Sequence, residues 1–255
     1  MRQYAPATPQ TPPAPSPPVL SRAGAVCALL GGVGYLALSV AHGNLPSTSG
    51  PPALRFVADR PGWPAIYLGL LACVLLWPVA FAALAGSIRR EPARLLGWLA
   101  AASVLVGAAV FAVDAALNGL ALRTVADQWA TAPSAALLQL GEVMVRLAYA
   151  TFSTYLMLLL GLPFVLAGLA MAASRSYPPW LGLLGAAAGT GALVGGATRF
   201  LGLHGVVPDG LLFGVFVLAG QVWLVLVGVL LWRQAATVPP LEAAAQRHPP
   251  VRSAS

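Results

Sequence analysis

The chain has 255 residues, of which 58% are hydrophobic and only 8% are charged. Soluble domains carry roughly a quarter charged residues, so this composition excludes a water-soluble globule and predicts a protein embedded in lipid. The net charge is +7, and every basic residue is an arginine. Because these arginines are scattered along the chain, we expect no nucleic-acid-binding surface.

Proline-rich and polar segments flank the apolar part of the chain. Residues 1–20 contain too many prolines for a helix, and residues 234–255 are polar and also contain proline. Both segments are therefore predicted to be disordered tails. Residues 21–233 between them are predicted to form one transmembrane domain.

Hydropathy and segment length predict an all-α polytopic membrane bundle of about six transmembrane helices, with both termini on the same side. Trp63 and Tyr67 are interpreted as interfacial aromatic residues at the start of the second helix, and Pro78 is expected to kink it. The expected spans are residues 23–41, 64–87, 95–117 with a helical continuation toward 126, a span within 134–173, 180–200 and 210–232.

The fourth apolar segment is too long for a simple span. A helix over residues 134–173 measures about 60 Å, twice the ~30 Å hydrocarbon core of a bilayer. We expect residues 134–146 to lie at or above the outer interface and the rest to cross the membrane. Thr131 or Ala132, before Pro133, is predicted to start this helix, and Gly161 and Pro163 to kink it.

The fifth apolar segment carries glycines four residues apart, at Gly185 and Gly189 and again at Gly191 and Gly195. Small residues at this spacing allow close approach of helix backbones in lipid. The pattern predicts an interior helix that packs within the bundle, with a dimer interface as the alternative.

The distribution of arginine predicts the orientation. With both tails inside, nine arginines lie inside and five outside, and the short loop with Arg89, Arg90 and Arg94 is the most basic connection. The positive-inside rule therefore predicts cytoplasmic termini in the plasma membrane of a bacterium.

A set of polar residues falls at the outer ends of the predicted helices. Asp114 and Asn118 are four residues apart and share a helix face, and Glu142 and Arg146 do the same. A carboxylate near lipid needs a partner or water, and Arg146 is the expected partner. We interpret the set as a pocket that opens outward between helices 3, 4 and 5; charges that anchor the helix ends are the alternative. The candidate residues are His42, Asp114, Asn118, Glu142, Arg146, Arg199 and His204.

No cofactor is expected. His42 and His204 lie on the same predicted side, but no third metal ligand stands at a characteristic spacing and no hydrolase motif is present. Cys27 and Cys73 both lie inside apolar runs, which indicates buried free thiols and neither a disulfide nor a metal site.

Three segments resemble a family of bacterial membrane proteins classed as a domain of unknown function, family 4386. The segments are VDAALNGLALRTVADQWA, GEVMVRLAYATF and SYPPWLGLLGAAAGTGAL. The resemblance covers less than half of the chain. It implies a multi-span helical membrane protein without an assigned activity, and it supplies no catalytic residues.

The leading functional hypothesis is a non-enzymatic membrane protein, either structural or a modulator of a protein partner. The alternative is a small-solute permease or ligand-sensing membrane protein that uses the outer polar cluster. A redox subunit with haem on histidine is a third possibility. The expected partners are the lipid bilayer and either a protein partner or a second copy of the chain.

Overall fold

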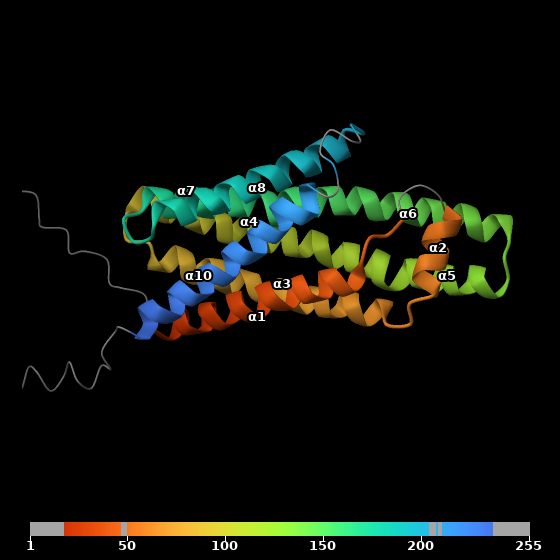
Figure 1. Ribbon diagram of the computed structural model, residues 1–255, viewed down its shortest axis with the longest axis horizontal. Coiled ribbons are helices and arrows are strands. Elements are labelled where there is room, and N and C mark those ends of the chain that lie inside the picture. The colour runs from red at the N-terminus through yellow and green to blue at the C-terminus, as the bar shows by residue number, and fades with distance from the viewer. Residues whose placement is uncertain (1–17, 47–49, 204–207, 209–210, 237–255) are drawn as a thin grey trace, which may run out of the picture.

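The computed structural model describes residues 18–46, 50–203, 208 and 211–236, which are helices and their connections without any strand (Figure 1). Three of the helical rods contain a π-helical turn, labelled η. The elements are α1 Pro18–His42, α2 Gly50–Ala58, α3 Trp63–Ser87, α4 Glu91–Ala115, η1 Ala116–Ala121, α5 Leu122–Thr131, α6 Ala135–Tyr155, η2 Leu156–Gly161, α7 Leu162–Ala173, α8 Pro179–Phe200, η3 Leu212–Val217 and α10 Leu218–Ala236.

Among the described residues, six helices are long and apolar enough to cross a membrane. This confirms the predicted all-α transmembrane bundle. The start of α1 and the end of α10 lie at the same end of the bundle (Figure 1). The predicted arrangement with both ends of the domain on one side is therefore also found.

The helical domain is slightly longer than predicted at both ends. α1 already begins at Pro18, because proline is preorganised for the first turn of a helix. α10 continues to Ala236, and Ala235 is buried in the bundle. The remaining residues of the predicted tails, 1–17 and 237–255, lie outside the described residues.

Two long helical rods extend beyond the other helices. α4, η1 and α5 form a continuous rod of 41 residues, and α6, η2 and α7 form one of 39 residues. Their projecting ends, together with the short helix α2, form an extension at one end of the bundle (Figure 1). The fourth apolar segment is longer than a membrane span, as predicted, and the third apolar segment is too. α2 packs against the projecting ends of both rods, at α5 and α6.

The start of α6 differs from the prediction. Ser134 caps the helix: its backbone is extended, and its hydroxyl oxygen accepts a hydrogen bond from the Leu137 amide at 3.2 Å. Pro133 lies before this cap. It disfavours the helical conformation at Ala132, where the backbone leaves the helical region and α5 has ended.

The kink predicted at Gly161 and Pro163 takes the form of a π-helical turn, η2, followed directly by α7. The wider turn accommodates a proline without a break in the rod. α3 likewise continues through Pro78 to Ser87.

The glycines of α8 pack within the bundle, as predicted. A Cβ on Gly182 would lie 2.5 Å from the Ala172 amide nitrogen, and one on Gly189 would lie 2.6 Å from that of Val165. The opposite face of α8 is exposed at Leu183 and Val194. α8 therefore packs on its neighbours within the bundle through its glycine face, and its opposite face lies on the surface of the bundle.

An aromatic cluster fills the bundle between α3, α7 and α10. Phe164 lies at the centre, with ring centroids 6.0 Å from Trp77, 5.5 Å from Phe81 and 5.2 Å from Trp223. All four side chains are buried. Such rings pack without voids and bury a large apolar area, so this level of the bundle is closed.

The two cysteines are free and only half-buried. The prediction of free thiols is confirmed, and the prediction that they are buried is wrong. Cys27 on α1 and Cys73 on α3 are both partly exposed.

Candidate functional site

A cavity of about 470 Å³ lies where α1 ends and α3 begins. We call it the polar cavity. The candidate pocket was predicted between the third, fourth and fifth membrane spans, which correspond to α4 to α5, α6 to α7, and α8. The structure adds walls from α1, from α3, and from η3 and α10. Its polar lining residues are Tyr35, Ser39, His42, Asn44, Tyr67, Asp114, Asn118, Tyr149, Tyr155, Arg199 and Gln221.

The polar cavity reaches into the bundle as far as the buried aromatic cluster. Tyr35 lines it seven residues before the end of α1, which corresponds to a depth of about 10 Å. The Tyr35 ring lies 5.2 Å from the ring of Trp77, which belongs to the buried aromatic cluster. The buried aromatic cluster therefore closes the inner end of the cavity.

Asp114 is the buried carboxylate of the site, with 1% of its surface exposed. Its Oδ1 atom accepts hydrogen bonds from Asn118 Nδ2 at 2.8 Å and from Thr151 Oγ1 at 2.6 Å. The first bond confirms that Asp114 and Asn118 share a helix face. The second links the third and fourth helical rods.

The predicted ion pair of Arg146 with Asp114 or Glu142 is not formed. Within the described residues, the ion pairs are Arg94 with Glu91 and Arg123 with Asp127. Asp114 is instead held by neutral hydrogen-bond donors.

Glu142 and Arg146 also lie outside the cavity wall. On α6, the wall is formed by Ala148, Tyr149, Phe152 and Tyr155, all of which lie closer to the C-terminal end of the helix than Glu142 and Arg146. The side chain of Glu142 packs against Gly50, the first residue of α2. Arg146 is exposed. Both residues therefore belong to the extension beyond the cavity.

Asn118 lies in the π-helical turn η1, which changes its backbone contacts. Its carbonyl oxygen accepts a hydrogen bond from Trp63 Nε1 at 2.8 Å, and its side-chain Oδ1 is buried without a hydrogen-bond partner. Trp63 is fully buried. The prediction of an interfacial Trp63 is therefore wrong, because the indole N–H finds a backbone acceptor inside the bundle.

His42 has defined contacts at both ring nitrogens. Nδ1 lies 2.6 Å from the Gly43 carbonyl oxygen, and Nε2 lies 3.0 Å from the Tyr67 hydroxyl. A carbonyl only accepts, so Nδ1 carries a proton, and in the neutral ring Nε2 accepts from Tyr67. Tyr67 is thus a buried hydrogen-bond donor and not an interfacial residue. His204 lies outside the described residues.

Gln221 on α10 is the polar residue that sequence reasoning missed. It is 1% exposed, lines the polar cavity, and neither Nε2 nor Oε1 has a hydrogen-bond partner among the described residues. The signal was visible as a single glutamine in the apolar run VLAGQVWLV. Tyr35 and Tyr155 were missed for a different reason, since tyrosine is common in membrane helices.

Arg199 lies in the last turn of α8 and also lines the cavity. Its guanidinium carbon is 5.7 Å from the centroid of the Phe152 ring. The described cavity wall therefore contains one carboxylate and one guanidinium, outside ion-pair distance of each other.

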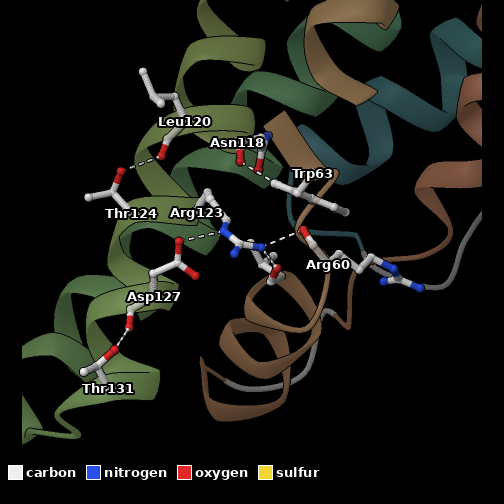
Figure 2. A network of polar contacts seen from close by, with 9 residues as sticks. Arg60, Trp63, Asn118, Leu120, Arg123, Thr124, Asp127 and Thr131 are labelled. Atoms are coloured by element: carbon white, nitrogen blue, oxygen red, sulfur yellow. Dashed lines mark hydrogen bonds and ion pairs between the residues drawn. The ribbon is translucent and has the colours of Figure 1, made fainter. Parts of the chain in front are cut away.

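The connection between α1 and α3 is fixed beside the cavity by Arg123 (Figure 2). Its Nη1 atom donates to the carbonyl oxygens of Val57 at 2.7 Å and Arg60 at 2.6 Å. Its Nε atom donates to Asp127 Oδ2 at 2.7 Å. Each of these carbonyls also accepts one backbone hydrogen bond, Val57 from the Arg60 amide at 3.1 Å and Arg60 from the Trp63 amide at 3.0 Å, so Arg123 adds a second, charged donor to both.

A second contact fixes the same connection nearer the cavity mouth. The Tyr149 hydroxyl donates to the Leu45 carbonyl oxygen at 3.2 Å. Because Tyr149 and Leu45 both line the cavity, this bond couples the shape of its rim to the position of the connection.

Comparisons of the chain with models of known protein families, with curated proteins and with solved structures find no match. The resemblance to the family of bacterial membrane proteins therefore stays a prediction. The function has to be argued from the cavity itself.

Proposed function

We propose that this chain is an integral membrane protein that binds a small solute in the polar cavity, as a ligand sensor or a permease. Gln221 is the observation that carries the proposal. Both polar atoms of its side chain face a buried site without a hydrogen-bond partner among the described residues.

The proposal rests on the energetic cost of unpaired polar groups. A buried amide group without a partner costs about 1–3 kcal/mol, and here Asn118 Oδ1 adds a further unpaired acceptor at the same cavity. A solute with hydrogen-bonding groups would satisfy both residues. Small-molecule sites have this composition, an apolar and aromatic wall with a few convergent polar groups.

The π-helical turns support the same proposal. η1 contributes Asn118 to the cavity wall, η3 contributes Val217, and η2 directly follows the lining residue Tyr155. Such turns are often found at functional sites, because they shift side chains and free backbone groups. The leading hypothesis from the sequence was a structural or partner-modulating protein, and such a protein requires no solute. A solute-binding experiment therefore distinguishes that hypothesis from the function proposed here.

Replacing Gln221 by methionine tests the proposal. The variant keeps the side-chain shape and removes both unpaired groups, so we expect the ligand-free protein to gain about 1–3 kcal/mol of stability and to lose solute binding. Thermal unfolding of the purified protein in detergent, with and without a library of cationic, anionic and neutral solutes, measures both effects. Gln139→Met on the exposed face of α6 is the matched control. Absence of stabilisation of the wild type by any solute, together with a less stable Gln221→Met, would refute the proposal.

We further propose that the protein lies in a bacterial plasma membrane with cytoplasmic termini. The support is the arginine-rich connection between α3 and α4, which lies at the end of the bundle where α1 begins (Figure 1). The polar cavity lies where α1 ends. In this orientation the cavity opens to the outside of the cell.

Reporter fusions test this orientation. A reporter that is active only in the cytoplasm is expected to work when fused after Ala236, and a periplasm-specific reporter when inserted after Asp59. The reverse pattern at both positions would show the opposite orientation.

A further inference from the structure

The carboxyl group of Asp114 has no cationic partner among the described residues. Its contacts are Asn118 and Thr151, both neutral and both directed at Oδ1. These donors stabilise a charged carboxylate, but they do not neutralise it. A buried carboxylate is costly in a membrane protein without a compensating positive charge.

Aromatic side chains line the same cavity as this carboxyl group. Tyr35, Tyr67 and Tyr155 contribute to its wall together with Asp114. Phe111 joins two of these residues, with ring centroids 6.4 Å from Tyr35 and 5.0 Å from Tyr155. The faces of aromatic rings attract cations, and a carboxylate within an aromatic wall is a typical site for organic ammonium groups.

The size of the cavity distinguishes an organic cation from an inorganic one. Its volume of about 470 Å³ lies within the roughly 300–1,000 Å³ of small-molecule sites. A metal ion would fill a small part of this space and would leave the amide of Gln221 unpaired. An organic cation with an apolar body and a hydrogen-bonding group matches both the size of the cavity and its polar lining residues Asp114 and Gln221.

We propose that the polar cavity binds a monovalent organic cation, with its ammonium group at Asp114 and its apolar body against the rings of Tyr35, Phe111 and Tyr155. This inference rests on the proposed solute-binding function and specifies the chemical class of the solute.

Three probes of similar shape test the charge preference of the full-length protein in detergent. The probes are phenylethylammonium, the neutral 2-phenylethanol and the anionic phenylacetate. Calorimetric titration is expected to show the tightest binding for phenylethylammonium, by at least about tenfold over the neutral probe. This comparison uses the wild type, so it decides the charge preference even where a variant fails to fold.

Asp114→Asn locates the charge that the ammonium group recognises. The asparagine retains the shape of the side chain and removes its charge. We expect binding of phenylethylammonium to weaken at least about tenfold and binding of 2-phenylethanol to stay unchanged. Asp59→Asn is the matched control, because Asp59 is an exposed carboxylate at the same end of the bundle and does not line the cavity.

Each other outcome overturns the inference in a recognisable way. Equal binding of the ammonium and neutral probes would leave a solute site without a cation preference. Tighter binding of phenylacetate would assign recognition to Arg199. Competition of sodium ions with the ammonium probe, with stabilisation by sodium alone, would assign the site to an inorganic cation. Failure of every probe and of the whole solute library would refute the proposed function together with this inference.

Discussion

Replacing Gly168 by leucine is expected to prevent assembly of the bundle, and Gly168→Ala to destabilise it by about 1–3 kcal/mol. A Cβ at Gly168 would overlap the backbone nitrogen of Ala186 and lie 2.5 Å from the carbonyl oxygen of Gly182. Backbone atoms cannot rotate out of the way, so α7 and α8 would have to separate. Separation would expose packed surface around Gly168 and weaken the wall that α8 contributes to the cavity.

The sign of the Gly168→Ala effect is informative, because alanine is the better helix former by about 1 kcal/mol. A lower unfolding temperature therefore reports the lost packing and not a lost helical preference. Thermal unfolding of the purified protein in detergent measures it.

Gly62→Ala provides the matched control for the added methyl group. Gly62 has no heavy atom within 4 Å of the added Cβ, and its φ of −79° suits alanine. We expect its unfolding temperature to stay close to that of the wild type. Equal unfolding temperatures for Gly168→Ala and Gly62→Ala would show that the crossing of α7 and α8 tolerates a wider spacing.

The membrane fold could be predicted because few sequence properties determine it. In lipid, every backbone polar group needs an internal partner, so an apolar segment of sufficient length becomes a helix. Proline and tryptophan marked the starts of several spans, and the structure places α3 at Trp63 and α8 at Pro179. The α2 helix was not predicted; its two prolines, Pro51 and Pro52, lie in the first turn, where a helix tolerates proline.

The candidate site could be predicted in part. His42, Asp114, Asn118 and Arg199 were expected at the same end of the bundle, and all four line the cavity. The contact of Asp114 with Asn118 needs helix geometry alone, and it was predicted from their spacing. The pairing of Arg146 with Asp114 required the relative height of two helices, which the sequence does not contain. α2 packs against the part of α6 that contains Glu142. Glu142 and Arg146 therefore belong to the extension of the bundle and not to the cavity wall.

The remaining site residues were missed because their role comes from the tertiary structure. Tyr35 and Gln221 lie in different apolar spans, and only helix packing brings them to one cavity. The π-helical turn at Asn118 depends on local hydrogen bonding and has no hydrophobic pattern. A single glutamine in an apolar span was the one signal that could have found part of this wall.

Replacing Arg123 by alanine is expected to destabilise the protein by about 2–4 kcal/mol. The Arg123 side chain is 17% exposed and donates three charge-assisted hydrogen bonds, two of them to carbonyls of the α1–α3 connection (Figure 2). Its loss leaves the carbonyls of Val57 and Arg60 without this donor. The connection should then become accessible to limited proteolysis between α2 and α3.

Arg94→Ala and Arg123→Lys provide the controls for this prediction. Arg94 pairs with Glu91 at the opposite end, with side chains 37% and 72% exposed, so its loss should cost less than about 1 kcal/mol. Arg123→Lys keeps the charge, but a compact ammonium group cannot reproduce the fork that reaches both carbonyls and Asp127. We therefore expect unfolding temperatures that fall in the order Arg94→Ala, Arg123→Lys and Arg123→Ala. If Arg123→Ala matched Arg94→Ala in both unfolding temperature and protease sensitivity, α2 would be held by apolar packing, and Arg123 would not determine the position of the cavity rim.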